Sequence, residues 1–448
     1  MKAVKDGKVT EADLDARLDE LLELVLSTHA AVEKAPRTFD AAAHHTLARR
    51  AAAESIVLLK NEDGILPLKA GEKLAVIGDF AQTPRYQGAG SSAVNALQVD
   101  ALLDCIKADD RGISFVGYAS GFDRQGAADP KKQEEAVSLA KQADTVLLCL
   151  GLDELRESEG LDRADMALAE NQQQLLDAVA AVNPNVVVLL SAGAPVETPW
   201  AGRCKALVYG ALGGQAGAGA AADILTGKLC PCGKLSQTWA KAHDDTPAKA
   251  NFGGEGRNVE YREGLYVGYR YYQTAGVKPA FPFGYGLSYT TFEYSGLKAD
   301  ETGATLTVTN TGSAAGAEIV QLYVAKPDGK IFRPEQELKG FAKVFLAPGE
   351  SKTVTIALDD KAFRYWNVKT NAWEVEGGSY QLRVGASCVD IRLTADITVK
   401  GTNAPDPYAG LSLTHYVSGQ ITYVTDAEFE ALLGHPIPED VVRIDRNM

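Results

Sequence analysis

The sequence contains no apolar run long enough to cross a bilayer. Its longest runs, such as Thr145–Leu150 and Val186–Leu190, fall far below the ~20 residues that a spanning helix needs. Residues 1–7 also lack the apolar stretch and the cleavage site of a secretory signal. We therefore expect a cytoplasmic protein that does not use a membrane.

Several chemical signatures are missing as well. Of the six cysteines, Cys230 and Cys232 form the one close pair, but they lack the two-residue spacer of zinc and redox motifs. No Gly-x-Ser-x-Gly nucleophile elbow and no zinc-protease histidine motif occurs. Two glycine-rich loops, 88–92 and 213–219, follow predicted strands but do not complete a dinucleotide fingerprint. We predict no metal, no nucleotide and no other cofactor.

The charge balance argues against nucleic acid as a partner. Lys and Arg number 45 against 59 Asp and Glu, a net charge of -14, and an acidic surface repels a phosphate backbone. Hydrophobic residues make up 46% and charged residues 23% of the 448 residues, which is ordinary for a globular protein. At ~150 residues per domain, this length predicts two or three domains.

Helical periodicity appears over residues 10–26, where Thr10 and Asp13 can form a capping box, and again over 41–55. From residue 73, short apolar strands alternate with helices, which is typical of a parallel sheet covered on both faces. Ligand-contacting loops of such sheets follow the carboxyl ends of the strands. Here these loops are 78–96, 151–169, 191–203 and 210–217.

The pattern of predicted secondary structure changes towards the C-terminus. From about residue 290, short strands separated by turn residues predict a β-sandwich. The stretch 261–292, rich in aromatic residues and glycine, marks the boundary between the two patterns. Its tyrosines between 261 and 272 could stack on sugars, although such a run more often packs a domain junction.

The loop 151–163 is the richest in chemistry, because it places several carboxylates and two arginines at the end of a strand. One interpretation is a solvated charged loop. The other is that one carboxylate is held where its pKa can be raised, so that it serves as a proton donor. Gly160 would let the backbone bend close to a ligand. The residues of this loop leave both interpretations open.

A set of motifs in order along the chain resembles glycoside hydrolase family 3, and most closely its β-glucosidase branch. The segments that carry the resemblance are 57–61, 88–92, 157–163, 231–235, 261–271 and 283–289. The resemblance implies an α/β plus all-β chain, in which a layered α/β sandwich domain precedes a fibronectin type III-like β-sandwich. It also implies hydrolysis of β-linked glucosides or oligosaccharides.

The same resemblance implies functional residues. Glu159 would be the general acid/base of a retaining mechanism. We assign the neighbouring motif residues to substrate binding: Arg85, Gly88, Gly90, Ser91, Ser92, Asp162 and Arg163.

One departure from the family pattern limits this assignment. The family's nucleophilic aspartate lies in a Ser-Asp-Trp motif within an upstream (β/α)8 barrel, and no Ser-Asp-Trp occurs here. Residues 3–26 resemble only the last helix of that barrel and the following linker. The chain is then either the acid/base half of a β-glucosidase or a non-catalytic carbohydrate-binding or interaction protein on a relict scaffold. As an acid/base half it would be a fragment of a longer protein or one of two complementing polypeptides, and its expected partners are a barrel polypeptide or a second copy of itself.

The expected organisation follows from these patterns. A face that a barrel normally covers would expose apolar side chains such as Leu152, Leu155 and Leu161. The expected divisions are a barrel-helix and linker remnant (1–55), the α/β sandwich domain with the acid/base loop (56–240), an aromatic and glycine-rich connector (241–289), the fibronectin type III-like domain (290–401) and a C-terminal tail (402–448).

Overall fold

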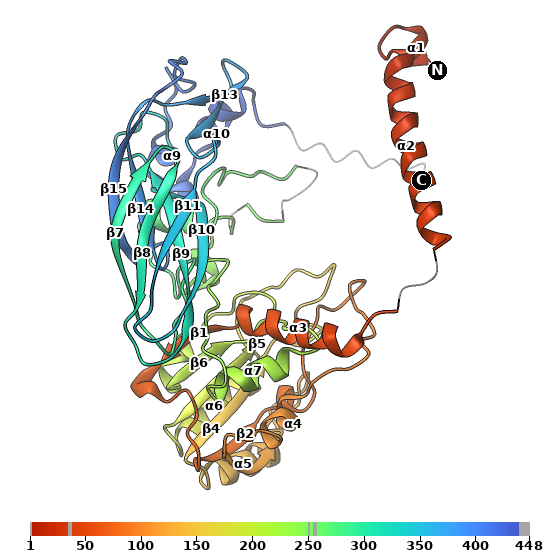
Figure 1. The fold of residues 1–448 in the computed structure, drawn as a ribbon, viewed down its shortest axis with the longest axis vertical. Coiled ribbons are helices and arrows are strands. Elements are labelled where there is room, and N and C mark those ends of the chain that lie inside the picture. The colour runs from red at the N-terminus through yellow and green to blue at the C-terminus, as the bar shows by residue number, and fades with distance from the viewer. Residues whose placement is uncertain (1, 35–37, 250, 254–257, 439–448) are drawn as a thin grey trace. The chain divides into compact units, whose positions relative to one another are not determined.

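The computed structural model describes residues 2–34, 38–249, 251–253 and 258–438. The chain divides into two compact units, residues 1–46 and 47–448. Figure 1 shows the course of the chain. None of the helices in the described ranges is long and apolar enough to span a bilayer.

The first unit consists mainly of one long helix. After the short α1 (Lys2–Lys5), α2 runs over Glu11–Val32, and the predicted capping box is present at its start. The Asp13 N–H donates to Thr10 Oγ1 over 3.0 Å, and the Thr10 N–H donates to the Asp13 carboxylate over 3.0 Å. The helix therefore begins as predicted but extends six residues beyond residue 26.

The apolar stripe of α2 is exposed rather than buried. No residue of this helix is buried, and Leu18 and Leu21 are 53% and 54% exposed. A helix gains most of its stability in proteins from packing its apolar face. Within the first unit, the stripe is thus a surface that no other element covers.

The α/β part of the second unit is built on a six-stranded sheet with the order β1-β6-β5-β4-β2-β3. Five strands are parallel, as the alternating pattern predicts: β2 (Lys73–Ile77), β3 (Ser114–Ala119), β4 (Thr145–Gly151), β5 (Val186–Ser191) and β6 (Ala206–Tyr209). The extended segment before them, β1 (Val57–Asn61), pairs antiparallel with β6 at the edge of the sheet. The sheet is therefore mixed, whereas the sequence pattern predicts only parallel pairing.

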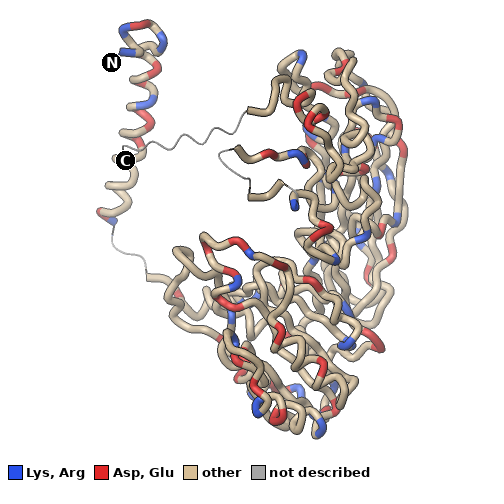
Figure 2. Tube along the Cα trace, turned by 180° about the vertical axis from the view of Figure 1, so that it is seen from behind, with Lys and Arg blue, Asp and Glu red and all other residues tan. Residues whose placement is uncertain are grey.

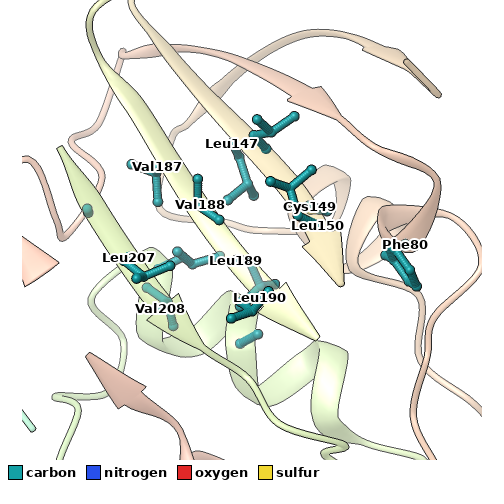
Figure 3. Packing of buried hydrophobic residues seen from close by; sticks show 14 of the residues in the cluster. Phe80, Leu147, Cys149, Leu150, Val187, Val188, Leu189, Leu190, Leu207 and Val208 are labelled. Atoms are coloured by element: carbon teal, nitrogen blue, oxygen red, sulfur yellow. The ribbon is translucent and has the colours of Figure 1, made fainter. Parts of the chain in front are cut away.

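Helices cover this sheet on both sides (Figure 1). They are α3 (Ala41–Ser55), α4 (Leu102–Lys107), α5 (Pro130–Ala140), α6 (Glu170–Ala180) and α7 (Gly217–Leu225). The core lies on the central strands, where every residue of β4 is buried. Leu147, Val188 and Leu207 come from three neighbouring strands and are fully buried (Figure 3). This rigid layer fixes where the loops at its carboxyl edge begin.

The β-sandwich packs two antiparallel sheets, with the orders β10-β9-β14-β15 and β11-β8-β7. Its strands are β7 (Phe292–Asp300), β8 (Gly303–Asn310), β9 (Gly316–Ala325), β10 (Glu337–Leu346), β11 (Ser351–Ala357), β14 (Gly378–Gly385) and β15 (Ile391–Val399). A separate hairpin joins β12 (Arg364–Asn367) to β13 (Ala372–Val375). The predicted fold class, an α/β sandwich followed by a fibronectin type III-like sandwich, is confirmed.

The aromatic stretch between the two domains is tied to both of them. The Leu287 N–H donates to the Leu58 carbonyl of β1 over 2.8 Å, and the Tyr285 hydroxyl donates to the Leu59 carbonyl over 3.2 Å. On the other side, the Gln321 side chain of β9 donates to the Gly284 carbonyl over 3.0 Å. Lys234, which is partly buried, pairs with the buried Glu318 of the sandwich at 3.2 Å.

The C-terminal tail packs on the tyrosines of this stretch. Helices α8 (Tyr269–Thr274), α9 (Thr414–Ser418) and α10 (Asp426–Leu433) surround a small core that includes Tyr266, Tyr271 and Tyr272. These three tyrosines pack the connector against the tail, whereas Tyr269 contacts the sandwich, where its hydroxyl accepts the Leu338 N–H over 2.8 Å. At its edge the His415 ring contacts the Glu428 carboxylate at 2.7 Å.

Candidate functional site

Two loops meet at the carboxyl edge of the sheet. One follows β2 and the other follows β4, and these strands are neighbours. Ala89 and Ser158 form an isolated parallel bridge between the loops, and the Glu159 N–H donates to the Ala89 carbonyl over 3.1 Å. The two loops singled out in the sequence therefore form one structure, with Glu159 at the point of contact.

Ser91 holds the carboxylate of Glu159. The Ser91 N–H donates to Glu159 Oε2 over 2.7 Å, and the Ser91 hydroxyl donates to the same oxygen. Both residues are exposed. The hydroxyl hydrogen bond, followed by that of the backbone, lowers the pKa of Glu159. In the isolated chain the pKa of Glu159 is therefore lowered rather than raised, because its exposed carboxylate accepts two hydrogen bonds that outweigh the effect of desolvation.

Gly90 allows this close approach. Its φ is +108°, and a Cβ there would lie 2.6 Å from Glu159 Cβ and 2.8 Å from Glu159 Oε2. Gly88 is less constrained, since a Cβ would meet only the Ser92 hydroxyl, at 3.1 Å. A side chain at position 90 would thus separate the two loops, while one at position 88 requires a hydroxyl to rotate.

Buried polar groups shape the base of the 151–163 loop. Asp153, 4% exposed, accepts the N–H groups of Leu155 and Arg156 over 2.7 and 2.9 Å. The Glu157 carboxylate accepts the Gly193 N–H over 2.9 Å. These bonds fix the turn that presents Glu159 to solvent.

Arg85 lies beneath the loop rather than beside Glu159. It is 4% exposed, and it donates to the Glu157 carbonyl over 2.9 Å. Its guanidinium also lies 3.7 Å from the Glu157 carboxylate and 3.8 Å from that of Glu154. In this chain Arg85 supports the loop from inside, so its position favours orienting the acidic residues over touching a substrate directly.

Three assigned residues remain, and their surroundings differ. Ser92 is exposed on the loop that carries Ser91. Asp162 is exposed and makes no hydrogen bond or ion pair with any residue that the structure describes. Arg163 is half-buried and donates to the Pro195 carbonyl over 3.0 Å, and burial lowers the pKa of its guanidinium. The structure therefore brings Gly90, Ser91 and Glu159 together and leaves Asp162 free on the rim.

Arg124 is a further residue at this edge that the sequence reasoning missed. It lies on the loop after β3 and contacts Glu154 at 2.9 Å and Asp79 at 2.6 Å. Its guanidinium also covers the Phe80 ring at 4.3 Å from the centroid. The signal was present, because β3 is parallel to its neighbours and its following loop must reach the same edge.

The apolar exposure predicted around the loop is correct for two residues and wrong for one. Leu155 and Leu161 are 64% and 62% exposed, but Leu152 is fully buried. Leu152 directly follows β4, and its N–H donates to the Ser191 carbonyl of β5 over 3.0 Å, which continues the sheet. Farther along the neighbouring loop, Val94 and Leu97 are 67% and 78% exposed. Apolar side chains thus flank Glu159 on both loops.

The acidic side chains are spread over the molecule and do not gather in one place. Figure 2 shows acidic and basic residues interspersed along the trace, so the excess of carboxylates does not form one acidic region. Within the described ranges, no group of three or more His, Cys, Asp or Glu side chains could hold a metal ion.

Comparison with known proteins adds to this geometry. Residues 56–289 match the glycosyl hydrolase family 3 C-terminal domain, and residues 318–388 match the fibronectin type III-like domain. The chain is 46% identical over 421 residues to an exo-α-(1→6)-L-arabinopyranosidase of Bifidobacterium breve, which covers 90% of this chain and 55% of the relative. It is 44% identical over 413 residues to the thermostable β-glucosidase B of Acetivibrio thermocellus, covering 90% and 54%.

Solved structures of β-glucosidases have the same fold as this chain. The family 3 β-glucosidase of Bifidobacterium adolescentis superposes with a TM-score of 0.85 at 44% identity, covering 94% of this chain and 64% of that one. A β-glucosidase of Streptomyces venezuelae, solved with D-glucose, gives a TM-score of 0.80 at 28% identity and covers 89% and 66%. The chain spans about half the length of the curated relatives that it matches.

Proposed function

Because the chain belongs to glycoside hydrolase family 3, we propose that it forms the acid/base part of a β-glucosidase-type hydrolase that removes terminal β-D-glucosyl residues with retention. The observation that carries the proposal is the seating of Glu159. Its loop is fixed by Asp153 and Glu157 from below and by Ser91 from the neighbouring loop, yet its carboxylate faces solvent. A substrate held against this edge could reach that carboxylate.

The chemistry needs a second carboxylate outside this loop. A retaining glycosidase uses two carboxyl groups ~5–5.5 Å apart on opposite sides of the scissile bond, one as nucleophile and one as acid and then base. Glu157 is bound to the Gly193 N–H, and Asp162 lies on the same loop as Glu159. Neither can face Glu159 across a sugar ring. We therefore assign the nucleophile to a barrel polypeptide outside these 448 residues.

A barrel docked on this edge would also change the acidity of Glu159. Covering the carboxylate removes water, and a nucleophilic carboxylate nearby adds a like charge, and both effects raise a pKa. They oppose the two hydrogen bonds from Ser91. Docking would then raise the pKa of Glu159 relative to the isolated chain and favour its protonated form. The proton donor is thus completed by docking.

Exposed apolar side chains around Glu159 support such a partner. Leu155, Leu161, Val94 and Leu97 are all more than 60% exposed and flank the carboxylate on two loops. Large apolar side chains gathered on exposed loops in this way favour an interaction site. A barrel polypeptide is the occupant that we propose, and self-association through the same surface is the alternative.

The test is complementation. Purified chain is mixed with a family 3 barrel polypeptide that carries Ser-Asp-Trp, and hydrolysis of cellobiose, 4-nitrophenyl β-D-glucoside and 4-nitrophenyl α-L-arabinopyranoside is followed. We expect background turnover from the chain alone and restored turnover in the mixture. The arabinoside is included because one relative is named as an arabinopyranosidase. If the mixture hydrolyses the arabinoside faster than the glucosides, the proposed sugar specificity is wrong but the proposed mechanism stands.

Variants assign the role of the carboxylate. In the active mixture, Glu159→Gln should lower the cellobiose rate by ~10²–10⁴-fold, the usual contribution of general acid catalysis. It should lower the first step on the nitrophenyl glycosides much less, because nitrophenolate leaves with little help from a proton. Glu135→Gln, an exposed carboxylate on α5, is the matched control and should leave both rates unchanged.

A non-catalytic carbohydrate-binding role is the second candidate, and the absence of a Ser-Asp-Trp motif from the 448 residues favours it for the chain alone. That role predicts sugar binding without turnover in every mixture, and equal behaviour of Glu159→Gln and Glu135→Gln. Efficient cellobiose hydrolysis by the isolated chain, unchanged in Glu159→Gln, would refute both candidates.

A further inference from the structure

A cavity of about 990 Å³ lies between the β-sandwich and the C-terminal tail. Its walls come from the hairpin β12–β13, from residues 331–334 and 407–411, and from the end of α10. None of its lining residues belongs to the loops around Glu159. Its volume is at the upper end of the ~300–1,000 Å³ that small-molecule sites occupy. Nothing in the proposed hydrolysis uses this cavity.

Two exposed tryptophans stand at one wall of the cavity. Trp366 and Trp373 face each other across the hairpin, with ring centroids 5.4 Å apart and planes at 76°. They are 43% and 59% exposed, whereas the other two tryptophans of the chain, Trp200 and Trp239, are 1% and 0% exposed. Core packing explains the buried pair but not the exposed pair. Large aromatic side chains left open beside a cavity favour a ligand.

A second group of aromatic side chains also lines the cavity. Phe332 stacks on Tyr408 with centroids 4.5 Å apart and on Tyr416 with centroids 5.7 Å apart. All three side chains line the cavity. The indole pair meets at a steep angle and so forms a corner rather than a flat slot. A puckered sugar ring, with apolar C–H groups on its faces and hydroxyls at its edge, fits a corner better than a flat aromatic molecule would.

The charged residues of the lining are mostly basic. The five cations are Arg333, Lys339, Lys361, Arg364 and Lys369, and Glu337 is the acid. Three of the cations are paired: Arg333 with Glu376, Lys339 with Glu337, and Arg364 with Asp360.

Two lysines of the lining have no carboxylate partner. Within the described residues Lys361 makes no ion pair, and the Lys369 ammonium group donates to the Asp406 carbonyl, over 2.7 Å, and to no carboxylate. The chain as a whole carries a net charge of -14. A local excess of positive charge in such a chain is complementary to an anionic ligand.

We propose that this cavity binds an acidic oligosaccharide, one that carries a uronic acid carboxylate. A pyranose ring packs into the indole corner of Trp366 and Trp373, and the carboxylate lies near Lys361 and Lys369. The inference is independent of the proposed hydrolysis, because it needs neither Glu159 nor a barrel. It assigns the sandwich and tail a role in holding a glycan.

The test is a titration of the isolated chain with two matched sugars: xylotriose, and xylotriose substituted with glucuronic acid. Binding is measured by calorimetry and by tryptophan fluorescence. We expect the acidic sugar to change the fluorescence and to bind at least ~10-fold more tightly than the neutral sugar. Added salt should weaken the binding of the acidic sugar and leave the binding of the neutral sugar unchanged.

Variants locate the site. Trp373→Ala should reduce binding of both sugars at least ~10-fold, and Trp373→Phe should retain part of it. Lys361→Gln combined with Lys369→Gln should bring the acidic sugar down to the affinity of the neutral one. Phe341→Ala, at an aromatic residue on β10 that is 68% exposed and outside the cavity lining, is the control and should bind as the unaltered chain.

Any of three results would overturn the proposal. It fails if neither sugar binds, if both sugars bind equally, or if Trp373→Ala binds as tightly as Phe341→Ala. A change of solution mass in Trp373→Ala without any sugar binding assigns the surface to a second copy of the chain instead. Glu159→Gln should leave every one of these affinities unchanged, so failure here and failure of complementation are read separately.

Discussion

Replacing Gly90 with alanine should detach Glu159 from Ser91. The added Cβ would stand 2.6 Å from Glu159 Cβ and 2.8 Å from Glu159 Oε2, whereas ordinary carbon contacts lie at about 3.5–4.0 Å. The two loops must therefore move apart by roughly 1 Å, and Ser91 cannot keep both hydrogen bonds to the carboxylate.

The backbone conformation of Gly90 sets how much the contact between the two loops should weaken. Gly90 has a φ of +108°, and a side chain in such a sparsely populated region costs about 1–3 kcal/mol. Since 1.4 kcal/mol is a factor of ten, the contact between the loops should weaken roughly 5- to 150-fold. Both loops are exposed at this point, so the loss should be local, with little effect on global unfolding.

The assay is nuclear magnetic resonance of the isolated chain, following the titration of the Glu159 carboxyl and hydrogen exchange of its N–H. In Gly90→Ala the pKa of Glu159 should rise towards its ordinary value, because the hydrogen bonds that lower it are lost. The N–H that donates to the Ala89 carbonyl should exchange faster. Gly88→Ala is the control, since its Cβ meets only a hydroxyl that can rotate. Identical behaviour of the two variants would refute the reasoning.

Three further outcomes are expected. Ser91→Ala should raise the pKa of Glu159 in the same titration, because the Ser91 hydroxyl makes the largest contribution to lowering it. Burial raises the pKa of Glu428, but hydrogen bonds from His415 and Thr425 outweigh it and lower that pKa to about 2, from an ordinary value of 4.5. The stability gained is therefore complete above about pH 4.5 and lost as the pH falls through about 2, so thermal melts of Glu428→Gln should depend less on pH over that window. Lys234→Met should cost ~3–5 kcal/mol in urea unfolding by leaving a buried carboxylate unpaired, and adding Glu318→Gln should recover much of the loss.

Regular elements were predictable because their signals are local. The runs Thr145–Leu150 and Val186–Leu190 are continuous and apolar, and they form the central strands β4 and β5. The direction of β1 was not predictable in this way. It is set by pairing with β6, and the partners of Val57 and Leu58 are Tyr209 and Val208, far away in the sequence. Local patterns indicate an extended segment but not its neighbour.

At the candidate site, too, local sequence predicts some features and tertiary contacts decide the others. The motifs identified Glu159 and the loop of Ser91, and the structure brings the two together. The direction of the Glu159 pKa could not be read from its own loop, because it depends on a hydroxyl 68 positions away in the sequence. Leu152 and Leu155 look equivalent in sequence, yet one continues the sheet and the other faces solvent. Burial of that kind is decided by tertiary pairing.

The aromatic stretch that joins the two domains has a consequence for modularity. Its backbone donates to β1 at Leu58, and its carbonyl at Gly284 is held by Gln321 of the sandwich. Removing the sandwich would therefore leave buried polar groups of the connector without partners, each at a cost of about 1–3 kcal/mol. The two domains should consequently melt in a single transition. Exchanging one sandwich for another in this family would require the connector and β1 to be exchanged with it, so the unit of inheritance is larger than either domain.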